Sequence, residues 1–150
     1  MGSNVNPNIS PLEVIGLSIT VVSFLFENTA DSQKRAWIAK MKKAQLQNKV
    51  CMDGLWSLCR HPNYFGEWMV WNGLTIASIP SILEFSESNL MFYTLIGSFA
   101  AIVYMMYDFL VYQTGAMPAE FFSEQKRPDY KNYQDTTNMF FPGPKKTKKQ

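Results

Sequence analysis

The feature that most constrains this chain is an uncharged run long enough to cross a lipid bilayer. From Leu90 to Tyr107 it reads LMFYTLIGSFAAIVYMMY, and apolar side chains continue past Asp108 to Tyr112. The hydrocarbon core of a bilayer requires about 20 mostly apolar residues in a helix. No polar face recurs at helical spacing in this run, which disfavours the alternative of a core helix in a soluble protein. We therefore predict a transmembrane helix over residues 90–112.

Two further segments are apolar and long enough to cross, although each is interrupted. Residues 9–29 carry a glutamate near each end. Residues 68–85 contain Pro80, which removes a backbone donor and should kink or end a helix. A membrane helix tolerates such a break where neighbouring groups satisfy the freed carbonyl. The predicted fold is an all-α, multi-pass integral membrane protein with about three transmembrane helices, in a single domain over residues 1–150.

The basic residues are sorted to one side of these three segments. Every Lys and Arg lies either in residues 28–67 or after Tyr112, two pieces that face the same side after three crossings. This positive-inside pattern predicts a cytosolic loop and tail and a lumenal N-terminus. The C-terminal KTKKQ spaces Lys146 and Lys148 as in the dilysine signals of endoplasmic-reticulum membrane proteins. An ordinary solvated basic tail has the same composition, so both interpretations stay open.

Composition excludes several other classes of protein. A net charge of +2 gives no indication of a nucleic-acid partner, and the 47% hydrophobic content excludes a disordered chain. One histidine and two cysteines leave little for a metal site, so none is expected. Cys51 and Cys59 fall on the predicted cytosolic side, where thiols stay reduced.

Polar and ionisable side chains that could form a site are most concentrated in residues 54–67, GLWSLCRHPNYFGE, just before the second apolar segment. Pro62 suits the first turn of a helix, and that helix would carry Asn63 and Glu67 on one face. Asn63 offers both a donor and an acceptor, as an amide-bearing ring needs. A carboxylate at the membrane boundary, such as Glu67, is costly and usually functional.

The residues around this helix start have two interpretations. Arg60 could offer a permanently charged fork to a phosphate at the helix N-terminus. Alternatively the segment is a membrane-entry cap, with Arg60 and His61 among headgroups and Tyr64 as an interfacial anchor.

Two other clusters combine polar and aromatic side chains. ENTADSQK, at residues 27–34, places Asp31 one helical turn after Glu27. The tail after the third segment combines Tyr130 and Tyr133 with basic residues, which could stack on rings and contact phosphates. The tail could equally lie on the membrane surface as an interfacial segment.

Four motifs in order along the chain resemble the C-terminal domain of the steroid 5-alpha-reductase family, closest to its branch with poorly defined substrates. They are E-x-x-A-D-x-Q-K from Glu27, RHPNYFGEW from Arg60, G-x-x-P-x-x-E from Gly115, and Y-x-x-Y-x-x-x-T followed by F-x-P from Tyr130. The resemblance covers nearly the whole chain. It implies an all-helical membrane enzyme of the endoplasmic reticulum that passes a hydride from NADPH to a carbon–carbon double bond conjugated to a ketone, in a steroid or another lipid.

The resemblance also implies which residues border the cofactor, while it leaves the catalytic residue unknown. Asn63 and Glu67 match family positions that line the cofactor pocket, and Asp31 matches an acidic residue that faces it. The remaining expected cofactor-binding residues come from the R-H-x-N-Y motif shared with sterol reductases and from the tail: Arg60, His61, Tyr64, Tyr130 and Tyr133.

Full-length members of that family have several more membrane helices on the N-terminal side, which polarise the substrate ketone and shape the lipid pocket. This chain corresponds to the last third of such a protein. We therefore expect the isolated chain to bind cofactor weakly or not at all, and to turn over only when paired with another copy or another membrane protein. This leaves open whether it is an enzyme by itself or a non-catalytic membrane adaptor.

A different enzyme class shares part of the pattern. Isoprenylcysteine carboxyl methyltransferases, which bind S-adenosylmethionine, have R-H-P-x-Y-x-G before a kinked membrane helix, and the segment from Arg60 resembles it. Glu67 after the glycine, and ADSQK before the motif, favour the reductase.

Overall fold

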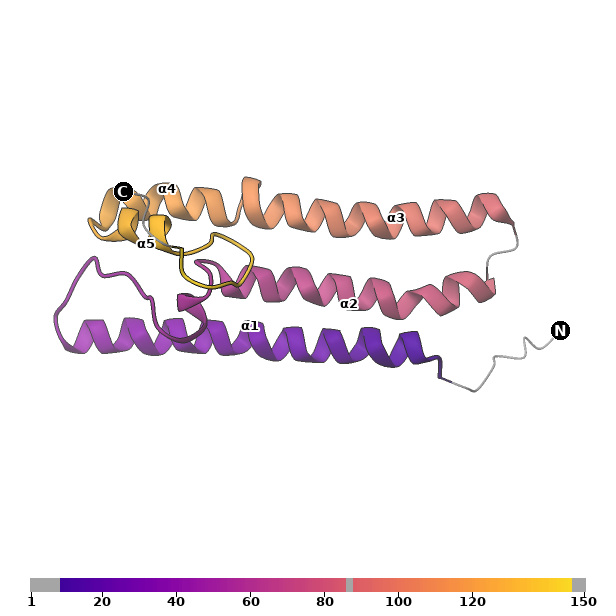
Figure 1. Cartoon of the computed structure of the whole chain (residues 1–150), viewed down its shortest axis with the longest axis horizontal. Helices are drawn as coiled ribbons and strands as arrows, with labels where there is room; N and C mark the ends of the chain where they lie inside the picture. The colour runs from indigo at the N-terminus through magenta and orange to yellow at the C-terminus, as the bar shows by residue number, and fades with distance from the viewer. Residues whose placement is uncertain (1–8, 86–87, 147–150) are drawn as a thin grey trace.

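The computed structural model describes residues 9–85 and 88–146, and over that range it is all-α, as predicted, with no strand. Figure 1 shows three long helices side by side, with the shorter elements gathered at one end. In chain order the elements are α1 (Pro11–Lys43), the 3₁₀ turn η1 (Gly54–Ser57), α2 (Pro62–Phe85), α3 (Asn89–Asp108), the π-helical turn η2 (Phe109–Gln113), α4 (Ala116–Lys126) and α5 (Tyr130–Thr136). Lys148 of the predicted dilysine pattern lies outside the described residues.

Two of the three predicted crossings lie in helices long and apolar enough to span a membrane. These are α1 and the helical stretch Asn89–Lys126, and only 11% of the apolar window in each is buried by the rest of the chain. The crossing predicted at residues 68–85 lies in α2, which falls short of the same criterion because polar residues such as Asn72 interrupt it. Three crossings therefore stay a prediction.

Helix α1 begins at a capping box and runs well past its predicted crossing. The Ser10 backbone N–H donates to Glu13 Oε2 at 2.6 Å, while the Ser10 hydroxyl accepts from the following turn. Glu13, which interrupts the apolar segment, thus satisfies a helix-end donor. The helix continues from residue 29 to Lys43, about 20 Å farther at the rise of an α-helix.

Helices α1 and α2 pack antiparallel through glycines. A Cβ atom on Gly16 would lie 2.3 Å from the backbone nitrogen of Ala77, and one on Gly73 would lie 2.7 Å from the backbone nitrogen of Thr20. Small residues that let two backbones approach so closely are typical of membrane helix pairs. Gly97 of α3 has no such neighbour within 4 Å.

Pro80 bends α2 rather than ending it. The helix continues past Pro80 to Phe85, and Figure 1 shows its axis changing direction over the last turns. A proline ring cannot donate to the carbonyl one turn earlier, which accounts for the bend.

The chain after α5 folds back over the start of α2. The backbone N–H of Arg60 donates to the Asn138 carbonyl at 2.8 Å, and that of His61 donates to the Met139 carbonyl at 3.1 Å. Phe140 follows and is only 3% exposed. The hydrophobic core sits here, at the polar end of the molecule, and combines Phe140 with Leu110, Val111 and the aromatic side chains of α2 and α3.

The glycine contact between α1 and α2 can be tested with a matched pair of substitutions. Gly97→Ala should raise the free energy of unfolding by up to about 1 kcal/mol, because alanine favours helix and the position is open. Gly16→Ala should instead lower it by about 1–3 kcal/mol, since its Cβ meets the backbone of α2. Thermal unfolding in mild detergent measures both; equal effects would contradict the packing.

Candidate functional site

A polar cavity of about 190 Å³ lies between α1, the start of α2, α4 and α5. Six of the eight predicted cofactor-binding residues line it: Arg60, His61, Asn63, Tyr64, Tyr130 and Tyr133. They come from two segments far apart in the sequence. The resemblance named these residues, and the fold brings them around one space.

Arg60 is buried and holds the tail in place. Its Nε and Nη2 donate to the two carboxylate oxygens of Glu120, at 2.6 and 3.0 Å. Its Nη1 donates to the carbonyl of Gln134 at 3.0 Å and to the carbonyl of Thr137. Four of the five N–H donors of a guanidinium are thus engaged within the chain. At most one remains for the phosphate that the sequence interpretation assigned to Arg60.

His61 lies against the same carboxylate. Its Nε2 donates to Glu120 Oε1 at 3.0 Å, and its ring stacks on Tyr64 with centroids 5.3 Å apart. Burial lowers the pKa of His61 below its usual range, although the hydrogen bond to Glu120 acts in the opposite direction. The imidazole is therefore neutral at physiological pH, and Nδ1 is the acceptor.

Glu120 was not among the predicted site residues, although it ends the motif that begins at Gly115. Burial alone would raise the pKa of Glu120, but hydrogen bonds from His61, Arg60 and Gln134 outweigh burial and lower it to about 2. The carboxylate is thus ionised and joins the start of α2 to the tail.

Two other cations line the cavity and are available to a ligand. Lys34 places its Nζ 4.1 Å from the ring centroid of Trp56, and Arg127 donates to the Ser123 hydroxyl at 2.9 Å. Neither forms an ion pair with a carboxylate within the described part of the chain. Lys34 ends the ADSQK motif but is not among the residues that the resemblance indicates as cofactor-binding.

The two predicted tyrosines form part of the cavity wall. Tyr130 is 4% exposed and Tyr133 is 2% exposed, and the Tyr133 hydroxyl donates to the Trp56 carbonyl. Their rings pack edge to face, 5.8 Å apart. Both are well placed to fix the shape of the cavity.

Asn63, which lines the cavity, carries an unsatisfied buried acceptor. Its Oδ1 is buried without a hydrogen-bond partner among the described residues. Such an atom costs about 1–3 kcal/mol, and native proteins rarely keep one without reason. A ligand N–H or O–H would satisfy it.

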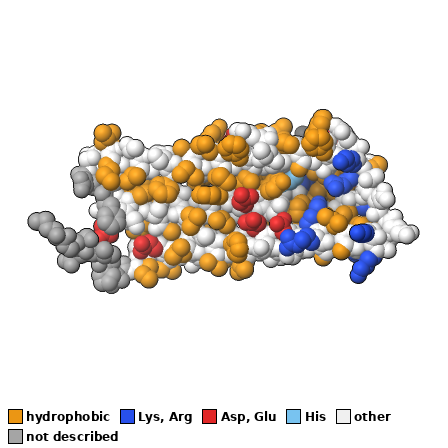
Figure 2. Space-filling model, turned by 180° about the vertical axis from the view of Figure 1, so that it is seen from behind, with side chains coloured by type: hydrophobic (Ala, Val, Ile, Leu, Met, Phe, Trp, Pro, Cys, Tyr) orange, Lys and Arg blue, Asp and Glu red, His pale blue; other side chains and the backbone are white. Residues whose placement is uncertain are grey.

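Asp31 and Glu67 lie beside the cavity rather than on its wall. Burial, followed by the charges of Glu67 and Asp31, raises the pKa of Tyr64, so both carboxylates are near that phenol. Figure 2 shows acidic side chains gathered near the middle of one face, next to the basic side chains of one end. Of the two residues predicted to share a helix face, Asn63 lines the cavity and Glu67 lies beside it.

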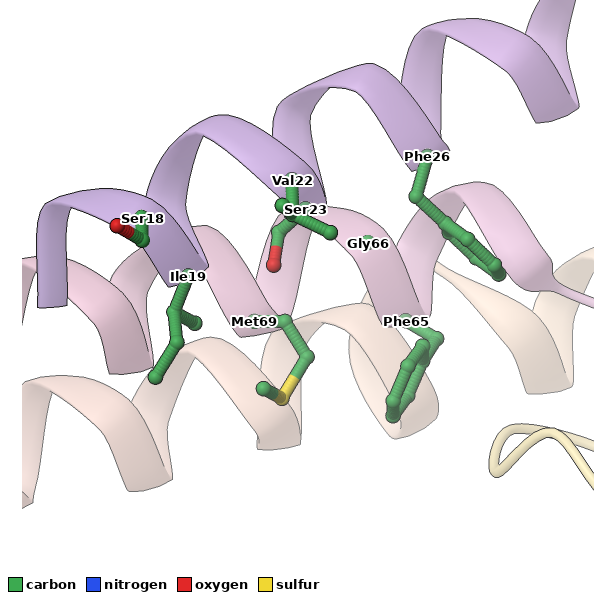
Figure 3. Close-up of a pocket in the computed structure, with 8 residues that line it drawn as sticks. All are labelled: Ser18, Ile19, Val22, Ser23, Phe26, Phe65, Gly66 and Met69. Atoms are coloured by element: carbon green, nitrogen blue, oxygen red, sulfur yellow. The ribbon is translucent and has the colours of Figure 1, made fainter. Parts of the chain in front are cut away.

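An apolar groove of about 390 Å³ lies between the apolar parts of α1 and α2 (Figure 3). Its walls are Ser18, Ile19, Val22, Ser23, Phe26, Phe65, Gly66 and Met69. A Cβ on Gly66 would lie 2.9 Å from the Glu27 side chain, so the helices touch at this end of the groove. The groove therefore extends from the apolar part of the molecule to the acidic residues beside the cavity.

A family model described as "Protein of unknown function (DUF1295)" matches residues 1–137, and the chain belongs to that family. This family is steroid 5-alpha-reductase-like, so the predicted resemblance is confirmed at the level of the family. No curated protein and no solved structure matches the chain.

The pH dependence of unfolding follows from His61 and Glu120. Below pH 6.5 His61 becomes protonated in the unfolded chain, while burial keeps the imidazole neutral in the folded protein. The free energy of unfolding therefore decreases as the pH is lowered. The contribution of Glu120 is complete above pH 4.5 and is lost as the pH falls toward about 2. The midpoint of thermal unfolding in detergent should decline accordingly from pH 7 to pH ~3.

Glu120→Gln separates these two contributions. At neutral pH it should destabilise the fold by about 3 kcal/mol or more, because it leaves the Arg60 charge buried and unpaired. It should also show no further loss between pH 4.5 and 2. Glu124→Gln, an exposed position on the same helix, is the control and should follow the wild-type profile. A wild-type profile in Glu120→Gln would refute the assigned role.

Proposed function

We propose that the chain is the nucleotide-binding part of a membrane-embedded NADPH-dependent reductase, acting on a carbon–carbon double bond conjugated to a ketone in a steroid or another lipid. The observation that carries the proposal is a cavity lined by Asn63, whose buried Oδ1 has no hydrogen-bond partner, and by two available cations. Membership of a steroid 5-alpha-reductase-like family supports the same reaction class.

The donor set of the cavity fits a phosphate-bearing nucleotide. Lys34 and Arg127 can each bind a phosphate oxygen, and the guanidinium does so with fixed geometry. Asn63 Oδ1 can accept from the carboxamide of a nicotinamide ring. NADPH, when bound, would supply the hydride. The same two cations disfavour S-adenosylmethionine, whose sulfonium is positively charged.

The apolar groove fits the lipid substrate. Its volume of about 390 Å³ lies within the range of about 300–1,000 Å³ that ligand pockets span. Tyr64 lines the cavity and directly precedes Phe65 of the groove wall. Its raised pKa keeps that phenol protonated, so it can donate a hydrogen bond to a ketone oxygen.

The proposed topology has three crossings, at residues 9–29, 68–85 and 90–112, in the membrane of the endoplasmic reticulum. The N-terminus is lumenal, and the cavity faces the cytosol. Another copy or a second membrane chain would close the groove against lipid. Two apolar helices support this arrangement, as does the presence of every Lys and Arg in residues 28–67 or after Tyr112.

The topology is tested by placing glycosylation acceptors in the chain. An Asn-x-Thr sequence introduced next to Lys42 should remain unglycosylated in microsomes, whereas one fused ahead of Ile9 should be glycosylated. The first site then lies on the cytosolic face and the second in the lumen. Glycosylation beside Lys42 would reject the topology.

Cofactor binding is tested by comparing two asparagines of α2. Asn63→Ala should weaken NADPH binding about tenfold to a hundredfold, because it removes the acceptor in the cavity. Asn72 donates to the Trp68 carbonyl within the helix at 2.8 Å and lies outside the cavity, so Asn72→Ala should leave affinity unchanged. Binding is read from energy transfer between tryptophan and NADPH in detergent.

Stability distinguishes a ligand contact from a structural one. Asn63 Oδ1 has no partner in the chain, so Asn63→Ala should not lower the unfolding temperature of the free protein. Equal affinity losses in the two variants, or protection from unfolding by S-adenosylmethionine instead of NADPH, would refute the proposal.

A further inference from the structure

A further groove, of about 540 Å³, lies between α2 and α3. It is lined by polar and aromatic side chains of both helices, among them Trp68, Asn72 and Thr75 of α2 and Tyr104 of α3. We call it the α2–α3 groove.

Helix α3 leaves one side of this groove open. It lies at one edge of the three-helix layer in Figure 1, and none of its 20 residues is buried by the rest of the chain. Tyr104 lines the groove and is nevertheless 69% exposed. A helix this apolar must contact either lipid or another chain, and the polar groups of the groove distinguish the two.

Two hydrogen-bonding groups of the groove lack partners. Asn72 Nδ2 donates to the Trp68 carbonyl at 2.8 Å, but Asn72 Oδ1 accepts no hydrogen bond from the described part of the chain. The Tyr104 hydroxyl has no partner within the same residues. Both residues fall inside proposed membrane crossings, where no water replaces a missing partner and an unpaired polar group is costly.

The two groups lie at a similar depth along the helices. Trp68 Nε1 donates to the Val103 carbonyl at 3.1 Å, so Trp68 is level with Val103. Asn72 is about 6 Å farther along α2. A helical side chain leans toward the N-terminus of its helix, and for α3 that is the direction in which α2 runs, so the Tyr104 hydroxyl extends toward the level of Asn72.

A phospholipid cannot satisfy these groups. Its headgroup stays at the membrane surface, whereas Asn72 lies at least about 6 Å inside the proposed crossing that begins at Trp68. Its acyl chains reach that depth but carry no donor for an amide oxygen. The missing groups must therefore come from another polar molecule inside the membrane.

A second copy of the chain supplies the missing groups. Two copies with the same topology in a membrane are related by a two-fold axis along the membrane normal, and the contact between them is isologous. This symmetry brings equal depths together. The Tyr104 hydroxyl of each copy can then donate to Asn72 Oδ1 of the other, so that one hydrogen bond forms twice.

The α2–α3 groove adjoins the apolar groove between α1 and α2. Phe141 lines the α2–α3 groove, and its ring centroid lies 6.1 Å from that of Phe65, in the wall of the apolar groove. A second copy in the α2–α3 groove would therefore lie at the edge of the proposed lipid site.

We propose that the α2–α3 groove is a self-association surface, in which α3 of a second copy packs and Tyr104 pairs with Asn72 across a two-fold axis. This inference rests on the membrane topology of the proposed function, but on neither its cofactor nor its substrate.

The test measures the monomer–dimer equilibrium of the full chain by sedimentation in mild detergent. Wild type should form dimers. Tyr104→Phe removes only a hydroxyl and should raise the dissociation constant of the dimer about threefold to tenfold. The control is Tyr93→Phe, since Tyr93 is 70% exposed on the same helix but does not line the groove; it should leave the dissociation constant unchanged.

Asn72→Leu removes the other half of the pair and should weaken the dimer by a similar factor. The double variant with Tyr104→Phe should be no weaker than the more affected single variant, because both substitutions remove the same hydrogen bond. Equal dissociation constants for Tyr104→Phe and Tyr93→Phe, or additive effects in the double variant, would contradict the pairing.

The remaining outcomes separate this inference from the proposed function. A wild-type chain that stays monomeric at every ratio of protein to detergent would overturn self-association, and NADPH binding by that monomer would leave the proposed function standing. A single copy that retains a lipid in native mass spectrometry, and loses it in Asn72→Leu, would assign the groove to lipid instead. A dimer that binds no NADPH would support the groove and refute the cofactor.

Discussion

The buried ion pair between Arg60 and Glu120 determines where the rest of the polar end lies. It joins the start of α2 to α4, and the two tail carbonyls that Arg60 also binds place α5 and the return segment. A pair this buried loses much of its hydration, and its net contribution depends on how completely the hydrogen bonds replace water. Here His61 and Gln134 add donors to the carboxylate, so almost every charged atom has a partner.

The molecule combines two kinds of packing at its two ends. At the polar end, hydrogen bonds and the aromatic cluster around Phe140 bury side chains as a soluble domain does. Along the long helices most apolar side chains face outward, and close approach at Gly16 and Gly73 supplies the contact between α1 and α2. Close contact between small residues is typical of helices in lipid, where shape rather than the hydrophobic effect drives association. The proposed site lies where these two regimes meet.

The sequence predicted elements that depend on local signals. The uncharged run became α3, Pro62 opened α2, and six of the eight predicted cofactor-binding residues surround one cavity, with Asp31 and Glu67 beside it. The length of α1 beyond residue 29 was not predicted, because hydropathy marks the lipid boundary and not the end of a helix. The partner of Arg60 could not be predicted either. The sequence shows that an arginine is present, but only the tertiary fold brings Glu120, 60 positions away, to its guanidinium.

The return of the tail over α2 has a consequence for the order in which the protein matures. The residues that line the cavity come from before and after α3 in the sequence, and an isolated backbone bridge between Cys59 and Asn138 joins the two parts of the chain. The long helices can form as each leaves the ribosome, but the tail contacts of Arg60 form only after residue 137 has been synthesised. The cavity is therefore assembled last, and a nascent chain stalled before α4 would have the three long helices but an incomplete cavity.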